Sequence, residues 1–392
     1  MTAKQAAVPA QAEERRRRII EREIPAELRD DLLVLSRAIH ADPELAYQEH
    51  RAVQRIVALL RKYGHEVELG IGGLPTAFRA RIGPPGRSAA LLAEYDALPE
   101  IGHACGHNLI AMSNVGAFLL AGLNARGQKL AHGIELIGTP AEESGGGKLD
   151  LLDAGVFKDT IAALSSHPSS DAFWSCGGAS LGITAFRVRF HGVAAHAAVS
   201  PDQGKNALNG AIRLFIGVDG WRQHLPSDAR VHGIITKGGA AQNIIPDLAE
   251  ADFGVRAKEL ATLEAMVEQF KRIAEGAALQ TDTTVEIEES MRMYQPVKAD
   301  ERITELLAAT LEGLEETVER GAFVWASTDF GNVSQAMAAD YISFPVADAE
   351  TPGHSIAFRE AAGRAVGEAN ALATAIALAR AATPTRQVFA AT

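Results

Sequence analysis

The chain has 392 residues, of which 47% are hydrophobic and 22% are charged, a balance typical of a globular protein with two or three domains. Its net charge of −11 argues against a nucleic-acid partner, because phosphate binding needs a basic surface. The two cysteines, Cys105 and Cys176, exclude a disulfide framework and a four-cysteine zinc finger and favour a reducing cytoplasm. A membrane span is not expected either, because it needs about 18 consecutive apolar residues and the chain has no such run.

The N-terminal segment carries four consecutive arginines, Arg15 to Arg18, with acidic residues on both sides. No apolar stretch follows them, so the segment does not fit a secretory signal or a transit peptide. Such basic runs usually form solvated faces, and we expect a partly frayed helix here. The sequence assigns no role to the arginines.

Short apolar runs then alternate with amphipathic segments, a pattern that predicts an α/β fold with a mixed, mostly parallel sheet and helices on both faces. Pro43 separates the first two helices, and Gly64 is expected to cap the second. In such sheets ligands bind at the carboxyl ends of the strands, where "EYD", "EE" and "SSHP" stand. The predicted helices are 25–40, 46–64 and 108–125, and the predicted strands are 65–69, 76–83, 88–98, 133–143 and 160–168.

From about residue 181 the predicted strands and helices follow a β-α-β-β-α-β order, which is typical of a ferredoxin-like α+β domain. We therefore predict an inserted domain over residues 181–294. The larger domain is expected to be discontinuous, with residues 1–180 and 295–392, and to end in one long Ala-rich helix over 359–382. The predicted strands of the insert are 180–192, 230–239, 243–257 and 283–289, and its helices are 206–225 and 260–280.

The stretch "GHACGHN" places Cys105 and His107 two residues apart in a Gly-containing loop. A thiolate and an imidazole suit zinc or a similar transition metal. Taken alone, the pair is equally consistent with a buried cysteine beside a hydrogen-bonded histidine. A redox role would need a second cysteine nearby, and Cys176 is far away in sequence.

Further metal donors follow along the chain. Glu142 and Glu143 end a predicted strand, so that one could coordinate a metal while the other acts as a general base, although a lone "EE" is more often a pair of exposed loop carboxylates. The following glycines, residues 145–147, indicate tight backbone packing there. His167 and His354, each uninformative alone, complete a set of five donors that suggests more than one metal ion. The segment "SGGGK" lacks the spacing of a P-loop.

These motifs carry a family resemblance. "HACGH", "GTPAEE…GGGK", "SSHP" and "PGH" resemble, in order and spacing, the di-metal amidohydrolases and metallopeptidases that include aminoacylase, hippurate hydrolase and the auxin-conjugate hydrolases, over roughly residues 35 to 390. "EYDALPEIGHACGHN" looks most like the branch of the aminobenzoyl-glutamate hydrolases and β-alanyl-lysine dipeptidase. Asn108, where relatives nearer hippurate hydrolase have Asp, favours that branch.

The resemblance implies a role for each matching residue. Two divalent transition-metal ions, zinc, manganese or cobalt, would be held by Cys105, His107, Glu143, His167 and His354. Glu142 would be the general base and acid, and His196 would stabilise the oxyanion from the partner subunit. Asn243 and Arg256 resemble the substrate-binding pair, with Arg256 suited to a carboxylate. Asp96 would orient a ligand histidine, while His103 and the segment 327–334 are left without a role.

The resemblance further implies that residues 1–180 and 295–392 form the metal-binding catalytic domain and that the insert is a lid or dimerisation domain that joins a homodimer. It also implies a reaction in which metal-activated water cleaves the amide bond of an N-acyl or N-aroyl amino acid or a dipeptide. Closure of a hinge between the domains would complete the site. Two alternatives stay open. One is a binding protein that has lost part of the site, and the other is deamination or decarbamoylation of a small aromatic or carboxylate substrate on the same scaffold.

Overall fold

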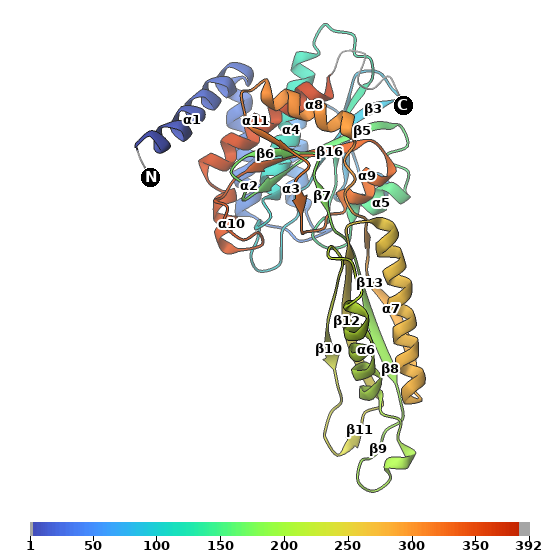
Figure 1. Cartoon of the computed structure of the whole chain (residues 1–392). Coiled ribbons are helices and arrows are strands. Elements are labelled where there is room, and N and C mark those ends of the chain that lie inside the picture. The colour runs from blue at the N-terminus through green and yellow to red at the C-terminus, as the bar shows by residue number, and fades with distance from the viewer. Residues whose placement is uncertain (1–2, 384–392) are drawn as a thin grey trace. The chain divides into compact units, whose positions relative to one another are not determined.

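The computed structural model describes residues 3–383, with side chains from residue 11 onward. The chain folds into two compact units, each with its own hydrophobic core (Figure 1). Unit 1 comprises the described parts of 1–179, 298–323 and 332–392, and unit 2 comprises 180–297 and 324–331.

An eight-stranded mixed sheet forms the centre of unit 1, in the order β1-β2-β4-β3-β5-β16-β6-β14. Its strands are β1 (Val67–Leu69), β2 (Phe78–Ile82), β3 (Ser88–Ala93), β4 (Gly133–Gly138), β5 (Thr160–Ser169), β6 (Trp174–Cys176), β14 (Val318–Arg320) and β16 (Ala339–Pro345). The helices are α1 (Ala3–Glu23), α2 (Ala26–Ala41), α3 (His50–Lys62), α4 (His107–Asn124), α5 (Gly147–Asp153), α8 (Glu301–Glu312), α9 (Phe330–Ala336), α10 (Ile356–Ala362) and α11 (Ala365–Ala382).

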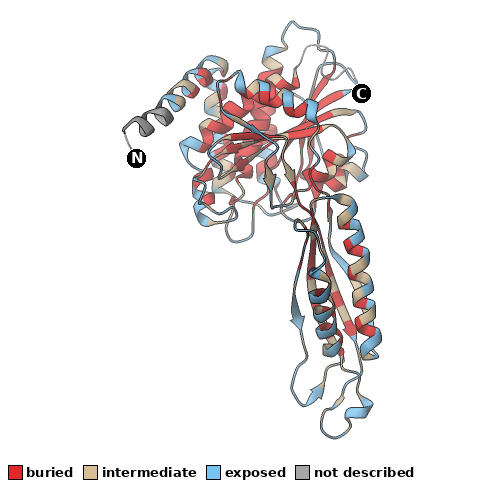
Figure 2. Ribbon diagram, in the orientation of Figure 1, coloured by how far each residue is buried: buried red, intermediate tan, exposed pale blue. Residues whose placement is uncertain are grey.

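The central strands of this sheet are parallel, and β3 and β4 are buried throughout. Strand β3 runs parallel to β4 on one side and to β5 on the other, and all of its residues are buried. Its continuous run "SAALLA" fits this position, because a strand covered on both faces needs apolar side chains in both directions. Figure 2 shows these strands and helices α4 and α11 as the buried interior of unit 1. The predicted mixed, mostly parallel sheet is confirmed.

Unit 2 is a four-stranded antiparallel sheet in the order β10-β12-β8-β13, with helices α6 and α7 sharing its core. Its elements are β8 (Gly182–His191), α6 (Ala207–Arg222), β10 (Arg230–Lys237), β12 (Leu248–Ala257), α7 (Leu260–Thr281) and β13 (Thr284–Tyr294). Phe186, Val188 and Phe190 alternate into the core along β8. Arg187 and Arg189 point the other way and pair with carboxylates of β12. This is the ferredoxin-like arrangement that the sequence predicted.

Phe190 gives a direct test of the core of unit 2. Its side chain is fully buried, and Gly210 of α6 packs directly against its ring. We expect Phe190→Ala to lower the free energy of unfolding by about 3–5 kcal/mol, because it removes buried apolar surface and leaves a cavity. Leu279→Ala, at a side chain that is 85% exposed, is the control and should change stability by less than about 0.5 kcal/mol. Chemical denaturation measures the free energy of unfolding of both variants. An equal loss of stability in the two would contradict the placement of Phe190 in the core of unit 2.

Several sequence-based boundaries are confirmed, and others need correction. The predicted strands 88–98 and 133–143 end earlier, at Ala93 and Gly138. The break between the first two helices lies at residues 42–49, and Gly64 follows α3 in the left-handed region with φ of 84°. The Ala-rich segment 359–382, predicted as one helix, is broken at Gly363 into α10 and α11. The segment 243–257, predicted as one strand, is divided into β11 (Ile244–Ile245) and β12, and β11 pairs with the short strand β9 (Ala195–His196).

The break between α10 and α11 has a structural cause in the side chains around it. His40 Nε2 lies 2.8 Å from the carbonyl oxygen of Arg359, and the Asn108 amide donates to the carbonyl oxygen of Ala362 at 3.1 Å. A continuous helix would use both carbonyls for its own hydrogen bonds. Asn108 also donates to Ser36 Oγ at 3.0 Å, so this residue of the "HACGHN" motif joins three segments of unit 1.

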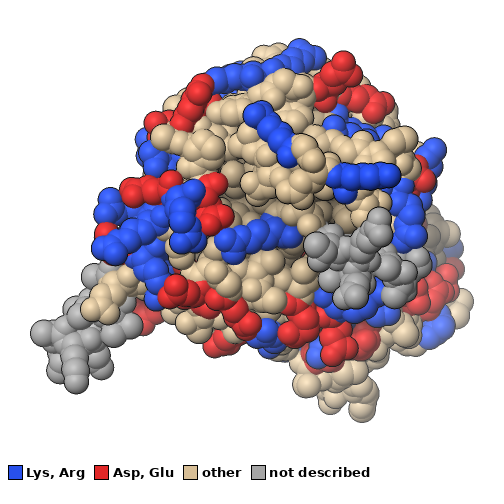
Figure 3. Space-filling model, turned by 90° about the horizontal axis from the view of Figure 1, so that it is seen from above, with Lys and Arg blue, Asp and Glu red and all other residues tan. Residues whose placement is uncertain are grey.

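The arginine run lies on α1, and one of its members is buried. Arg16 makes a bidentate ion pair with Glu316, at 2.7 and 2.8 Å, and stacks over the ring of Trp174. Arg17 and Arg18 are exposed and pair with Glu14 of the same helix, as expected for a solvated face. The expectation of a wholly solvated segment is therefore wrong for Arg16, which docks the helix. On the face of the molecule shown in Figure 3, basic and acidic side chains are interspersed.

Within residues 3–383, none of the helices has the length and apolar character needed to cross a bilayer.

Candidate metal centre

Three neighbouring strands of unit 1 end at the same edge of the sheet. Glu94 and Asp96 follow β3, Glu142 and Glu143 follow β4, and His167 lies near the end of β5. Because β3 is parallel to both neighbours, their carboxyl ends converge, and the polar side chains gather there.

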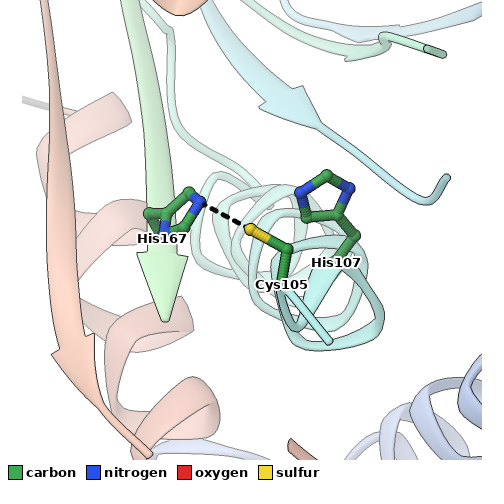
Figure 4. A group of neighbouring side chains, drawn as sticks. All are labelled: Cys105, His107 and His167. Atoms are coloured by element: carbon green, nitrogen blue, oxygen red, sulfur yellow. Dashed lines mark hydrogen bonds between the residues drawn. The ribbon is translucent and has the colours of Figure 1, made fainter. Parts of the chain in front are cut away.

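The loop of the "HACGH" motif approaches this edge from the start of α4. Cys105 Sγ lies 3.5 Å from His167 Nε2, and His107, the first residue of α4, lies on the other side of the thiol (Figure 4). Gly106 between them has φ of 76°, and a Cβ atom there would lie 2.7 Å from the ring of Pro168. Only glycine permits this turn so close to the end of β5, and the turn brings Cys105 beside His167.

Both imidazoles of this group are held through their Nδ1 atoms. His107 Nδ1 lies 2.9 Å from Asp96 Oδ1, and His167 Nδ1 lies 2.7 Å from the carbonyl oxygen of Pro168. Each Nδ1 donates its proton to an oxygen that can only accept, so each Nε2 presents a lone pair toward Cys105. A carboxylate behind a histidine is the arrangement that orients metal-ligating imidazoles.

A second donor group shares Cys105 and adds Glu143 and His354. Glu143 Oε2 lies 3.6 Å from His354 Nε2, and the Glu143 backbone N–H donates to Asp96 Oδ2 at 3.0 Å. His354 has φ of 54°, a left-handed conformation that is uncommon for histidine, and its N–H donates to the carbonyl oxygen of Ala104. The loop is thereby anchored directly beside Cys105.

The third donor group contains a residue that sequence reasoning missed. Glu94, His107 and Glu142 also bring their donor atoms together, and all three are buried. Glu94 forms an ion pair of 2.7 Å with Lys148, which has no exposed surface. Glu94 stands in the "EYD" that marks the end of β3, and this strand-end position is the sequence signal that could have identified it. Lys148 closes the "GGGK" segment, whose glycines pack tightly, as expected: a Cβ atom on Gly147 would lie 2.0 Å from the Pro140 carbonyl oxygen.

The carboxylates of the centre favour a positive charge at His107 Nε2, either as a proton or as a bound cation. Burial would lower the pKa of His107, but the Asp96 carboxylate raises it well above the usual value. Burial would raise the pKa of Asp96, yet His107, the Glu143 N–H and Lys148 lower it. Burial lowers the pKa of His167 and, with the Glu143 carboxylate, raises that of the Cys105 thiol. A cation would stabilise the thiolate instead.

The residues at this edge fit a metal ion. Among the described residues, His107 Nε2, Glu143 Oε1 and Glu94 Oε2 are buried without a hydrogen-bond partner. Buried polar atoms are nearly always paired, because an unpaired one costs about 1–3 kcal/mol. With His107 neutral, all three are acceptors, so a shared cation satisfies them where a further acceptor would not. Sulfur, imidazole nitrogen and carboxylate oxygen together suit zinc and similar transition metals.

His103, whose role the sequence did not indicate, belongs to none of these groups. It is buried, and its ring stacks on that of His40 with centroids 6.3 Å apart. Burial, with the neighbouring His107 and His40, lowers its pKa to about 3 and keeps it neutral.

The other predicted site residues lie in unit 2. His196 is exposed on β9, and its Nδ1 accepts from the backbone N–H groups of Ala198 and Val199, both at 3.2 Å. A neutral His196 therefore carries its proton on Nε2, where it can donate to a negative oxygen. The Asn243 carbonyl accepts from the Ala197 N–H at 2.9 Å, so the structure brings the His196 and Asn243 segments together.

Arg256 lies at the other end of β12 from Asn243. About eight residues of extended strand separate them, which corresponds to roughly 26 Å, so the two cannot contact one substrate group within one chain. The Arg256 guanidinium donates to His232 Nε2 at 3.3 Å and to Ser327 Oγ at 3.1 Å. Both partners are uncharged, because burial and the nearby Arg256 lower the pKa of His232. Within the segment 327–334, Ser327 thereby gains a contact with Arg256.

Comparison with known proteins places this site in a family. Residues 179–282 match the model of a peptidase dimerisation domain. The mouse Xaa-Arg dipeptidase is 37% identical over 374 residues, which cover 90% of this chain and 85% of the mouse protein. The chain belongs to the M20 peptidase family. The predicted resemblance is confirmed, and this M20 chain is a metal-dependent hydrolase that acts on amide bonds.

Further relatives agree with this assignment. A p-aminobenzoyl-glutamate hydrolase protein of Escherichia coli is 35% identical over 62% of this M20 chain and 54% of its own length. Among solved structures, the YXEP protein of Bacillus subtilis, described as a dinuclear metal-binding peptidase of the M20 family, has a TM-score of 0.69. It is 22% identical and matches 90% of this chain and 98% of its own. At that identity the likeness shows the shared fold.

Proposed function

We propose that this M20 enzyme hydrolyses the amide bond of an N-acyl or N-aroyl amino acid or of a dipeptide. The proposal rests on three overlapping donor groups, two of which share Cys105 and two of which share His107. The buried carboxylate of Glu142 lies 3.8 Å from His107 Nε2. A carboxylate beside a metal centre is the arrangement needed to move protons between water and a leaving amine.

Two divalent transition-metal ions would occupy the centre, one held by Cys105, His107 and His167 and the other by Cys105, Glu143 and His354. The unpaired buried acceptors support this assignment. When bound, such ions supply Lewis acidity and lower the pKa of water toward about 7. Zinc, manganese and cobalt all suit these donors.

Different residues of the chain carry out proton transfer and substrate binding. Glu142 takes a proton from the attacking water and passes it to the leaving amine. His196, with its proton on Nε2, stabilises the oxyanion, which it would reach in the partner subunit of a homodimer. Asp96 orients His107. Arg256 binds a substrate carboxylate, and Asn243 contacts the substrate from the His196 side of unit 2.

The dimer itself would form through residues 181–294, the inserted lid and dimerisation domain of our proposal. The match to a peptidase dimerisation domain supports this region as the interface.

A hinge between this domain and the catalytic domain, residues 1–180 and 295–392, stays a prediction. Residues 1–2 and 384–392 of the catalytic domain lie outside the described part of the chain. The cytoplasmic location also stays a prediction.

The substrate class can be tested with a panel of N-acyl, aminobenzoyl and β-alanyl amino acids and of dipeptides ending in arginine, each with zinc, manganese and cobalt. The relatives named above motivate the aminobenzoyl and the arginine substrates. Release of a free amino acid together with the acyl or aroyl product is expected. Ammonia as the product, with no amino acid released, would favour deamination or decarbamoylation and contradict the proposal.

Arg256 gives a test of carboxylate recognition. Its guanidinium is held by two neutral groups, which leave its charge for a substrate carboxylate. We expect Arg256→Lys to raise KM by about 10- to 100-fold with a smaller change in kcat, because a hydrogen bond to a charged group contributes about 1.5–3 kcal/mol and lysine lacks the planar fork. Steady-state kinetics measures both constants.

The matched control is Arg230→Lys, at the residue paired with Arg256 across β10 and β12. Arg230 stacks on Trp325 and donates to backbone carbonyls, so its replacement should leave KM close to that of the wild type. A substrate analogue with a carboxamide in place of the carboxylate should show no difference between Arg256→Lys and wild type. An equal KM effect on both substrates would refute the assignment.

A further inference from the structure

The buried pair of Glu94 and Lys148 lies directly against the donor groups, and the mechanism above does not use it. Glu94 is 3% exposed and Lys148 is fully buried, with 2.7 Å between Lys148 Nζ and Glu94 Oε1. Burying a charge is costly unless it is paired, so each of the two residues stabilises the other in this position.

The ion pair with Lys148 involves only one of the two Glu94 carboxylate oxygens, Oε1. Oε2 is buried without a hydrogen-bond partner and lies 3.7 Å from His107 Nε2, which is also unpartnered. The Nδ1 proton of His107 is donated to Asp96, so in the neutral ring Nε2 and Oε2 are two acceptors that face each other. An ion pair with only a structural role would be expected to satisfy both carboxylate oxygens, whereas a cation between these two atoms would satisfy both at once.

We propose that Glu94 is a further metal donor, which supplies Oε2 to an ion that it shares with His107. This inference rests on the metal centre of the proposed function. The donor atoms of Glu94 and His107 lie within 4.8 Å of each other and of a donor atom of Glu142. Lys148 then acts as a positioning residue: by binding Oε1 it turns Oε2 toward His107 and offsets part of the negative charge of Glu94, Glu142, Glu143 and Asp96.

The test is the metal affinity of Glu94→Gln, which keeps the shape of the side chain and removes its charge. The measurements are metal content per chain by elemental analysis after dialysis, and the zinc dissociation constant by competition with a chelator. We expect the dissociation constant of one ion to rise by at least about 10-fold, since even groups that only orient a ligand contribute 10- to 100-fold. Glu94→Asp, which keeps the charge for Lys148 but draws the oxygen back, should weaken the same ion.

Glu135→Gln is the matched control. Glu135 is also a buried carboxylate paired with a cation, Arg81, at 2.7 Å, but it lies toward the amino end of β4, whereas Glu142 and Glu143 follow the carboxyl end. Its replacement should change stability and leave zinc affinity as in the wild type. Wild-type zinc affinity in Glu94→Gln would overturn the inference and leave the proposed function standing. If Glu94→Gln does not fold, wild-type affinity in Glu94→Asp overturns it equally. A wild-type chain that binds no zinc would instead refute the metal centre of the proposed function.

Discussion

Glu142→Gln is expected to lower kcat by about 10²- to 10⁴-fold while the chain keeps its fold and its metal, because glutamine cannot accept the proton of the attacking water. Glu142 is 6% exposed and sits at the edge where the donor groups meet, so its amide replacement fits the same space. Turnover of a good substrate from the panel, measured next to metal content, provides the comparison.

The neighbouring Glu143→Gln is the contrasting variant. Glu143 belongs to the donor group of Cys105 and His354, so this change should remove metal as well as activity. Near-normal turnover in Glu142→Gln, or loss of metal in that variant, would show that the roles of the two adjacent carboxylates are not divided in this way.

Cys105→Ser is expected to lose most of its metal on dialysis and, with it, activity. Cys105 Sγ is common to two of the three donor groups, and a serine hydroxyl is not deprotonated as readily as a thiol when a cation binds. A fall in metal affinity of at least about 100-fold is therefore expected, at the upper end of the effect of groups around a metal. Elemental analysis and chelator competition measure it.

Cys176→Ser controls for the loss of a buried thiol. Cys176 is buried in β6 and is a member of none of the donor groups. It should cost some stability and leave the metal content unchanged. Full metal occupancy in Cys105→Ser would show that the thiol is not a ligand.

The sequence predicted the fold well because its signals are local. The continuous apolar run of β3 and the alternation of β8 each specify a strand and its environment. The break at Gly363 could not be predicted, because it depends on His40 and Asn108, which are distant in sequence and bind the carbonyls of α10. The burial of Arg16 was missed for the same reason, since its partner Glu316 is 300 residues away.

The candidate site shows the same limit. The strand-end positions of Glu143 and His167 and the family motifs pointed to five donors, and the structure brings all five together. Glu94 and Lys148 were missed, because neither stands in a spacing typical of ligands and only burial shows that they pair. The resemblance named Asn243 and Arg256 as a pair, yet the length of β12 separates them within one chain.

Asp96 links two of the candidate donor groups through a single side chain. Its Oδ1 holds His107, a donor of one group, and its Oδ2 accepts from the backbone of Glu143, a donor of the other. In the proposed centre, an ion bound to His107 would therefore also restrain Asp96 and, through it, the backbone that presents Glu143, so a second ion would meet a group that is already ordered. The centre should consequently fill cooperatively, with few chains carrying one ion when metal is scarce.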